Sequence, residues 1–143
     1  MMKTLIRSML LTATAIVCLT LPQVARSNPE IIELEQMPEE SLELTQTLTG
    51  ETTLNCDATP QSPNWKIEMT QPFPYLRFSI QSEGEPVLII DGPGGRFCVL
   101  GDNYSGDHPE MSGLWDAGEY NIYIGNRTPG EYSYTLTISQ KPN

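Results

Sequence analysis

The chain is poor in the residues on which enzyme catalysis most often depends. Among its 143 residues there is one histidine, His108, and there are three cysteines. Any serine- or cysteine-based triad would have to use His108 as its base, and a single histidine beside Pro109 in a loop is usually a solvated surface residue. The eighteen Asp and Glu residues are numerous enough for a close pair to arise by chance, so no pair is singled out for sugar hydrolysis. We therefore expect no catalytic activity, with a hydrolase as the less favoured alternative.

Long hydrophobic runs are also scarce, and the longest lies near the N-terminus. Two basic residues precede an apolar stretch at 9–21, and the small residues Ala25 and Ser27 follow it. An apolar stretch this short is typical of an export signal rather than of a membrane span. We interpret residues 1–27 as a signal peptide, with a membrane anchor as the alternative. A lipoprotein is disfavoured, because the bulky Val17 precedes the cysteine of this segment.

Basic residues are few, and the predicted signal contains three of them. Without residues 1–27, five Lys and Arg remain against eighteen Asp and Glu, a net charge of −13 on 116 residues. A surface so acidic repels phosphate backbones and anionic lipid headgroups. We therefore expect no binding to nucleic acid and no stable membrane insertion after the signal is removed. The remaining length fits one domain.

Cys56 and Cys98 are the two cysteines that would remain after export. An even pair in an exported protein most often forms one disulfide, which fits a periplasmic or extracellular location in bacteria. Closing a loop of this length would stabilise the fold by about 4 kcal/mol in the chain-entropy treatment. One alternative is two buried free thiols. A metal site shared with His108 is less favoured, because zinc requires four closely organised ligands.

The exported part of the chain shows no convincing helical period. Residues 28–40 are rich in Glu and contain Pro38, so we expect a flexible acidic segment with at most one helical turn. Over residues 41–143, short runs of alternating apolar and polar residues are separated by turn residues, which predicts about eight strands of an antiparallel sandwich or barrel. Residues 86–91 include four successive apolar side chains, as expected of a strand covered on both faces. Residues 101–118 form the longest irregular segment.

Oxygen-bearing side chains gather in and beside this irregular segment. Calcium binds six to eight such oxygens, and the candidate ligands are Asp91, Asp102, Asn103 and Asp107. Their order lacks the regular alternation and the closing glutamate of an EF-hand. Asp and Asn also occur in turns because their side chains bond to local backbone amides. Calcium is the one cofactor that the sequence suggests.

Three aromatic residues are candidates for ligand binding, because a sandwich that stacks glycans needs exposed Trp or Tyr rings. Tyr104 and Trp115 lie in the segment 101–118, and Tyr123 is out of phase with the apolar face of its strand. A loop tryptophan can instead be buried as a plug at the end of a sandwich. Trp65 is interpreted as a core residue.

The second half of the chain has an ordered series of motifs. An apolar strand ending in Asp91 runs into a Gly-rich turn, a short strand and an acidic loop, and the segments AGEYNIYIG (117–125) and GEYSYTLTI (130–138) follow. This series resembles the bacterial pre-peptidase C-terminal domain and its small secreted relatives. The similarity covers residues 75–139 well and 41–70 loosely.

The resemblance implies a jelly-roll-like β-sandwich that serves as an accessory domain in secretion or in substrate or matrix binding, in some relatives with calcium. The family's calcium ligands would correspond to Asp91, Asp102 and Asn103. Two adjacent aspartates are commonest where Asp102-Asn103 stands, so this sequence lacks one charge. We expect an exported, non-catalytic module that binds an exported protein or a cell-surface or extracellular polysaccharide. The alternative is a structural domain that stabilises a partner and binds no small ligand.

Overall fold

The computed structural model describes residues 28–35, 41–50, 53–58, 60, 62–101 and 108–142. These residues form two sheets, one of five strands in the order β1-β3-β8-β5-β6 and one of four in the order β2-β9-β4-β7, and they contain no helix. The strands are β1 (Glu30–Leu34), β2 (Ser41–Gly50), β3 (Trp65–Met69), β4 (Phe73–Gln81), β5 (Pro86–Gly92), β6 (Gly95–Leu100), β7 (Glu110–Trp115), β8 (Gly118–Asn126) and β9 (Gly130–Ser139). The predicted all-β sandwich is confirmed.

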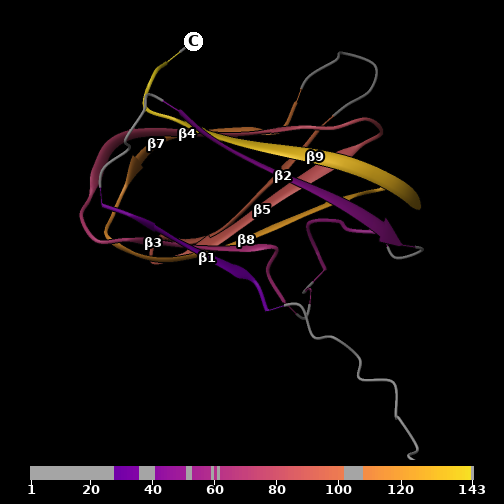
Figure 1. Ribbon diagram of the computed structural model, residues 1–143, viewed down its shortest axis with the longest axis horizontal. Coiled ribbons are helices and arrows are strands. Elements are labelled where there is room, and N and C mark those ends of the chain that lie inside the picture. The colour runs from indigo at the N-terminus through magenta and orange to yellow at the C-terminus, as the bar shows by residue number, and fades with distance from the viewer. Residues whose placement is uncertain are drawn as a thin grey trace, which may run out of the picture.

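The strand pairs have the arrangement of a jelly roll. β5 and β6 form a hairpin, and moving outward from it along the chain β4 pairs with β7, β3 with β8 and β2 with β9, all antiparallel. When such a ribbon is rolled up, successive pairs fall in alternate sheets. The pairs β5–β8 and β4–β9 then complete each sheet. Figure 1 shows the two layers, with β2, β4 and β9 in one and β1, β3, β5 and β8 in the other.

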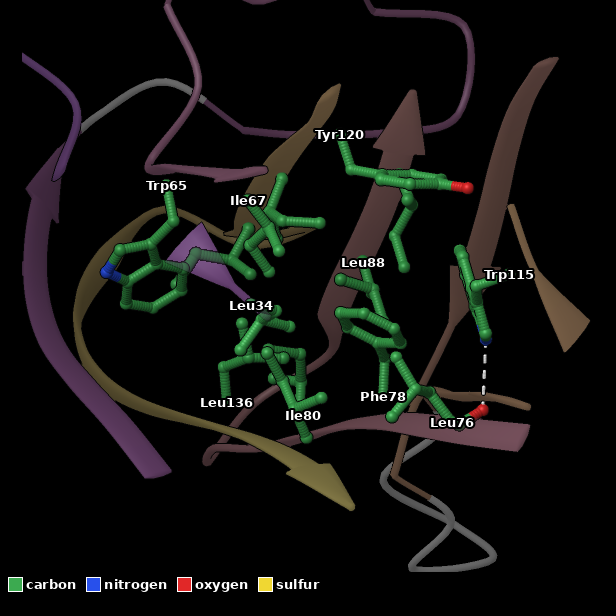
Figure 2. Packing of buried hydrophobic residues seen from close by; sticks show 14 of the residues in the cluster. Leu34, Trp65, Ile67, Leu76, Phe78, Ile80, Leu88, Trp115, Tyr120 and Leu136 are labelled. Atoms are coloured by element: carbon green, nitrogen blue, oxygen red, sulfur yellow. Dashed lines mark hydrogen bonds between the residues drawn. The ribbon is translucent and has the colours of Figure 1, made fainter. Parts of the chain in front are cut away.

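The core lies between the two sheets and is formed largely by alternate residues of the interior strands. In β4, Leu76, Phe78 and Ile80 are fully buried, whereas the residues between them are half-buried. Successive side chains of a strand point to opposite faces. Figure 2 shows these three residues in one cluster with Leu88 of β5 and Leu136 of β9. Alternation along the sequence therefore corresponds to the inner and outer faces of the sandwich.

β5 differs from the other strands because both of its faces are covered, as its apolar run predicted. Leu88 and Ile90 point into the core between the sheets. Val87 and Ile89 lie on the opposite face, where they form a second buried cluster with Leu54. The outer face of the five-stranded sheet thus has a cover of its own, and Leu54 comes from the connection between β2 and β3.

Two expectations about irregular segments are wrong. The expected flexible segment 28–40 contains β1, which pairs in parallel with β3 and buries Leu34. The expected irregular segment 101–118 contains β7, which pairs with β4 at the edge of its sheet. Both strands lie at sheet edges and expose several side chains, so their apolar alternation is weak. Residues 36–40 and 102–107 lie outside the described residues.

The predicted signal peptide, residues 1–27, also lies outside the described residues. Nothing helical in the part of the chain that the structure describes has the length and apolar character needed to cross a membrane. Export of the protein therefore stays a prediction from the sequence.

Candidate functional site

A loop between β2 and β3 lies over the outer face of the five-stranded sheet. We call residues 53–64 the β2–β3 loop; the structure describes all of them except 59 and 61. The Cys56–Cys98 disulfide joins this loop to β6, with an Sγ–Sγ distance of 2.07 Å, which confirms the predicted pairing. The side chain of Arg96, also in β6, donates a hydrogen bond to the carbonyl of Ala58. The loop is therefore attached covalently to an edge strand of the sheet that it covers.

The β2–β3 loop is also held against β8. The Leu54 amide donates a hydrogen bond of 2.8 Å to the Asn126 carbonyl, and the Leu54 side chain is buried. Gly125 permits this approach, because a Cβ atom at that position would lie 2.6 Å from Leu54 Cβ, well inside van der Waals contact. At the end of the loop, Asn64 Oδ1 accepts a hydrogen bond of 2.8 Å from the Ile124 amide. The disulfide and these hydrogen bonds thus hold the loop in place at several separate points.

A cleft of about 590 Å³ lies between this loop and the adjoining ends of β2, β8 and β9. Ligand pockets typically have volumes of about 300–1,000 Å³. The lining combines tyrosine rings, hydroxyl and amide groups and apolar side chains, and the described residues that form it include no charged residue. They are Leu48, Thr49, Thr53, Leu54, Ala58, Pro60, Ser62, Asn64, Tyr123, Ile124, Gly125, Asn126, Thr128, Gly130, Tyr132 and Tyr134.

Asn126 organises one side of the cleft. It is 5% exposed, and its Oδ1 accepts hydrogen bonds of 2.9 Å from the Glu85 amide and from Thr128 Oγ1. Its Nδ2 donates a hydrogen bond of 3.0 Å to the Glu83 carbonyl. Thr128 Oγ1 in turn lies 2.9 Å from the Tyr132 hydroxyl. A single buried carboxamide, fully hydrogen-bonded within the protein, therefore links β8 to the turn before β5 and to β9.

The three tyrosines of the cleft differ in the contacts of their hydroxyl groups. The Tyr132 hydroxyl is hydrogen-bonded within the network just described. Burial raises the pKa of Tyr134 above its ordinary value of 10.0, an effect that outweighs the lowering by its hydrogen bond with the Asn126 side chain. Tyr134 is therefore neutral at physiological pH. Tyr123 is half-buried, and its hydroxyl forms no hydrogen bond with the described residues.

The structure places the three predicted ligand-binding aromatic residues in different settings. Tyr123 lines the cleft from the outer face of β8, out of phase with the buried Tyr120 as its strand position predicted. Tyr104 lies outside the described residues. Trp115 requires a correction, because it is the last residue of β7 and not a loop residue.

Trp115 belongs to the core. It is 6% exposed, and its Nε1 donates a hydrogen bond of 3.0 Å to the Leu76 carbonyl. Its ring lies 4.6 Å from the ring of Phe78 and 5.4 Å from that of Tyr120, measured between centroids. Figure 2 shows the ring among these residues, with the hydrogen bond drawn as a dashed line. Packing on this scale leaves no ring face for a stacked sugar, so Trp115 stabilises the sandwich.

Asp91, the first candidate calcium ligand, lies at the turn end of the β5–β6 hairpin. Gly101, which follows β6, donates a hydrogen bond of 2.8 Å from its amide to the Pro86 carbonyl at the other end of β5. At about 3.4 Å per residue, Pro86 and Asp91 are about 17 Å apart along this strand. Asp91 and Gly101, the residue before Asp102, therefore lie at opposite ends of the β5–β6 hairpin.

The other candidate calcium ligands, Asp102, Asn103 and Asp107, lie outside the described residues. Within residues 28–35, 41–50, 53–58, 60, 62–101 and 108–142, no three His, Cys, Asp or Glu side chains are grouped so as to hold a metal ion. His108 is exposed, as expected of a solvated loop histidine. Calcium binding stays a prediction.

Sequence reasoning missed most of the cleft, because its walls come from segments that are distant along the chain. Nothing in the local patterns brings the β2–β3 loop beside Asn126 and Tyr132. One signal was available. The apolar run 86–91 required a cover on its outer face, and the cysteine pair indicates that the segment around Cys56 supplies that cover.

Comparison with known proteins identifies a relative of this chain. The chain is 33% identical over 112 residues to an uncharacterised protein of the cyanobacterium Synechococcus elongatus, and the match covers 76% of this chain and 81% of the relative. No family model matches the chain. No solved structure matches it either. The resemblance to the pre-peptidase C-terminal domain therefore stays a prediction.

Proposed function

We propose a function for this chain, which belongs to the same family as the Synechococcus elongatus protein. In this proposal the chain is an exported, non-catalytic β-sandwich module that binds an exported protein or a polysaccharide outside the cytoplasm. The cleft beside the β2–β3 loop is the binding site. The observation that carries the proposal is this cleft, which is large enough for a ligand and is formed by the β2–β3 loop and the adjoining ends of β2, β8 and β9.

The walls of the cleft favour binding because they are ordered in advance. The β2–β3 loop is held by the Cys56–Cys98 disulfide and by the hydrogen bonds of Leu54 and Asn64. A ligand that enters a site already in its bound shape does not incur the entropic cost of ordering it. The hydroxyl and amide groups of the lining supply directional contacts. A rigid, polar and partly apolar cleft is suited to recognition.

The chemical groups of the cleft support a non-catalytic role. General acid–base catalysis requires a group whose pKa lies near the working pH. The described lining offers phenols, alcohols and carboxamides but no carboxylate, imidazole, thiol or amine. Burial raises the pKa of the Tyr134 phenol still further from neutrality. The cleft is thus equipped to hold a ligand rather than to transform it.

The disulfide supports the proposed location, because disulfides persist in oxidising compartments. The predicted signal peptide points the same way. We propose a periplasmic or extracellular location, with no nucleic-acid partner and with calcium as the one cofactor that the sequence suggests.

Co-sedimentation with a cell-envelope and exopolysaccharide fraction of the source organism tests the proposal. The oxidised chain 28–143 should be retained, and Thr53→Trp, which fills the cleft from its exposed edge, should lower retention at least tenfold. Thr45→Trp is the matched control, because Thr45 is exposed on β2 outside the cleft. No retention of the unmodified chain, or equal retention of both variants, would favour the structural role without a ligand at this site.

A further inference from the structure

The described lining of the cleft carries no charge, although the protein as a whole is strongly acidic. The whole chain has eighteen acidic and eight basic residues, and 18% of its residues are charged. The described residues that line the cleft include none of them. We propose, resting on the function proposed above, that the cleft binds an uncharged polysaccharide chain and that Tyr123 is its stacking platform.

The charge distribution disfavours ionic ligands. The chain has a net charge of −10, so the protein as a whole repels polyanions. A cationic polymer is attracted to the surface as a whole, but the described lining offers no carboxylate to pair with it. Burying an unpaired charge in such a site costs free energy, because the charge loses its hydration without gaining a partner. An uncharged ligand avoids both penalties.

The lining matches the two kinds of surface that a sugar ring presents. A pyranose has C–H groups on its faces and hydroxyl groups around its edge. The side chains of Leu54, Ala58 and Pro60 supply apolar surface, and those of Thr53 and Ser62 supply hydroxyl groups beside it. All five belong to the β2–β3 loop, so one fixed segment provides both kinds of contact.

Tyr123 is the tyrosine whose groups are available to a ligand. It is half-buried on the outer face of β8 and packs against the Val87–Ile89–Leu54 cluster. The Tyr132 hydroxyl is hydrogen-bonded to Thr128 and Tyr134 is buried in the core, whereas the hydroxyl of Tyr123 has no partner among the described residues. A tyrosine held in this way offers a rigid ring for stacking and a hydroxyl for hydrogen bonding.

The experiment measures binding of the oxidised chain 28–143 to immobilised polymers. The probes are neutral glucans, mannans and galactans, the polyanions alginate and polygalacturonate, and an exported-protein fraction of the source organism. We expect retention on at least one neutral polymer and none on the polyanions. Tyr123→Ala should weaken binding about tenfold or more, as expected for an aromatic contact at the centre of an interface.

Two further variants keep the test decisive if Tyr123→Ala disturbs the fold. Tyr123→Phe keeps the ring and loses one hydrogen bond, so it should weaken binding by about 2- to 10-fold. Tyr75→Ala removes a half-buried tyrosine of β4 that does not line the cleft, and it should leave affinity unchanged. Equal affinities for folded Tyr123→Ala, Tyr75→Ala and the unmodified chain would overturn the stacking role of Tyr123, and unchanged affinity in Tyr123→Phe would overturn the hydrogen bond of its hydroxyl group to the ligand.

The outcomes separate this inference from the proposed function. Preferential binding to a polyanion or to an exported protein, abolished by Thr53→Trp, would overturn the inference about the ligand but leave the cleft as the binding site. Binding to none of the probes would overturn both. Binding to a neutral polymer that Thr53→Trp does not affect would place the site elsewhere on the molecule.

Discussion

At the scale of single residues, an aromatic side chain belongs either to the core or to the candidate ligand contacts. The face of the strand on which it lies decides which. Tyr120 and Tyr123 belong to the same strand. Tyr120 is 3% exposed and packs against Trp115, whereas Tyr123 lies on the opposite face and lines the cleft. Side chains three positions apart in a strand point to opposite faces. One strand therefore contributes both to the core and to the proposed binding site.

The burial of Trp115 predicts a large loss of stability in Trp115→Ala. We expect the free energy of unfolding to fall by about 3–5 kcal/mol, because the change leaves a cavity between the sheets and removes the donor to the Leu76 carbonyl. Urea unfolding of the oxidised chain 28–143 measures it. Leu114→Ala is the control, since Leu114 is 69% exposed in the adjacent position, and it should change stability by about 0.5 kcal/mol at most. Similar small effects in both variants would contradict the placement of Trp115.

Buried tyrosines predict that the fold loses stability in alkali. Burial raises the pKa of Tyr120 and of Tyr134 above 10.0, and the charge of Asp116 adds to the effect on Tyr120. The unfolded chain therefore releases these protons at lower pH than the folded chain. The contribution of these two neutral tyrosines to the free energy of unfolding is complete below about pH 10. It is lost as the pH rises from there through their pKa in the folded state.

Urea unfolding at a series of pH values, without reductant, tests this prediction. The free energy of unfolding of the unmodified chain should decrease as the pH rises above about 10. Tyr134→Phe has one ionisable phenol fewer and should show a shallower decrease. Identical slopes in the two proteins would show that Tyr134 does not contribute to the alkaline loss.

At the scale of elements, interior strands were predictable and edge strands were not. The alternation in β4, β8 and β9 is strong because every second side chain enters the core between the sheets. In β1 the fully buried position is Leu34, and β7 contains Ser112 and Gly113. A strand at a sheet edge pairs on one side and leaves several side chains in solvent, so its sequence pattern approaches that of a loop.

The cleft was less predictable than the fold, because its contacts are not local. Alternation along β8 reveals that Tyr123 lies on the outer face of its strand, and the sequence indicated Tyr123 as a candidate ligand-binding residue. It does not reveal that the β2–β3 loop returns to cover β8, since that depends on Gly125 admitting Leu54 and on the hydrogen bonds of Asn64. Trp115 was misplaced for the related reason that β7 was not recognised as a strand.

The assignment of β1 to the sheet predicts that Leu34 stabilises the fold. Leu34→Ala should lower the free energy of unfolding by about 2–5 kcal/mol, as for other buried leucines. Ile31→Ala, on the same strand but 63% exposed, should change it by about 0.5 kcal/mol or less. Thermal or urea unfolding measures both. If Leu34→Ala is as mild as Ile31→Ala, residues 30–34 form the flexible segment that the sequence suggested.

At the scale of the whole molecule, one covalent bond connects the stability of the sandwich with the shape of the cleft. The disulfide joins residues 42 positions apart, and it fixes the loop that forms one wall of the cleft. The buried side chain of Leu54 and the hydrogen bond between Asn64 and the Ile124 amide also hold this loop, independently of the disulfide. We therefore expect the reduced protein to fold, with lower stability.

Replacing both cysteines measures this contribution. The Cys56→Ser and Cys98→Ser double variant should have a free energy of unfolding about 4 kcal/mol lower than the oxidised chain, because the unfolded chain regains the entropy of an open loop. Reductant should destabilise the unmodified chain and leave the double variant unchanged, which serves as the control. No effect of reductant on the unmodified chain would show that the bond contributes nothing to stability.

The central claim is that the cleft beside the β2–β3 loop is the ligand-binding site. Amide chemical-shift mapping by NMR tests it most directly, with the isotope-labelled, oxidised chain 28–143 titrated with soluble fragments of neutral polysaccharides. We expect saturable shifts concentrated in residues 53–64 and 123–126, and we expect Thr53→Trp to abolish them. Saturable shifts concentrated away from these residues, for example at the β5–β6 turn, or shifts that Thr53→Trp leaves unchanged, would contradict it.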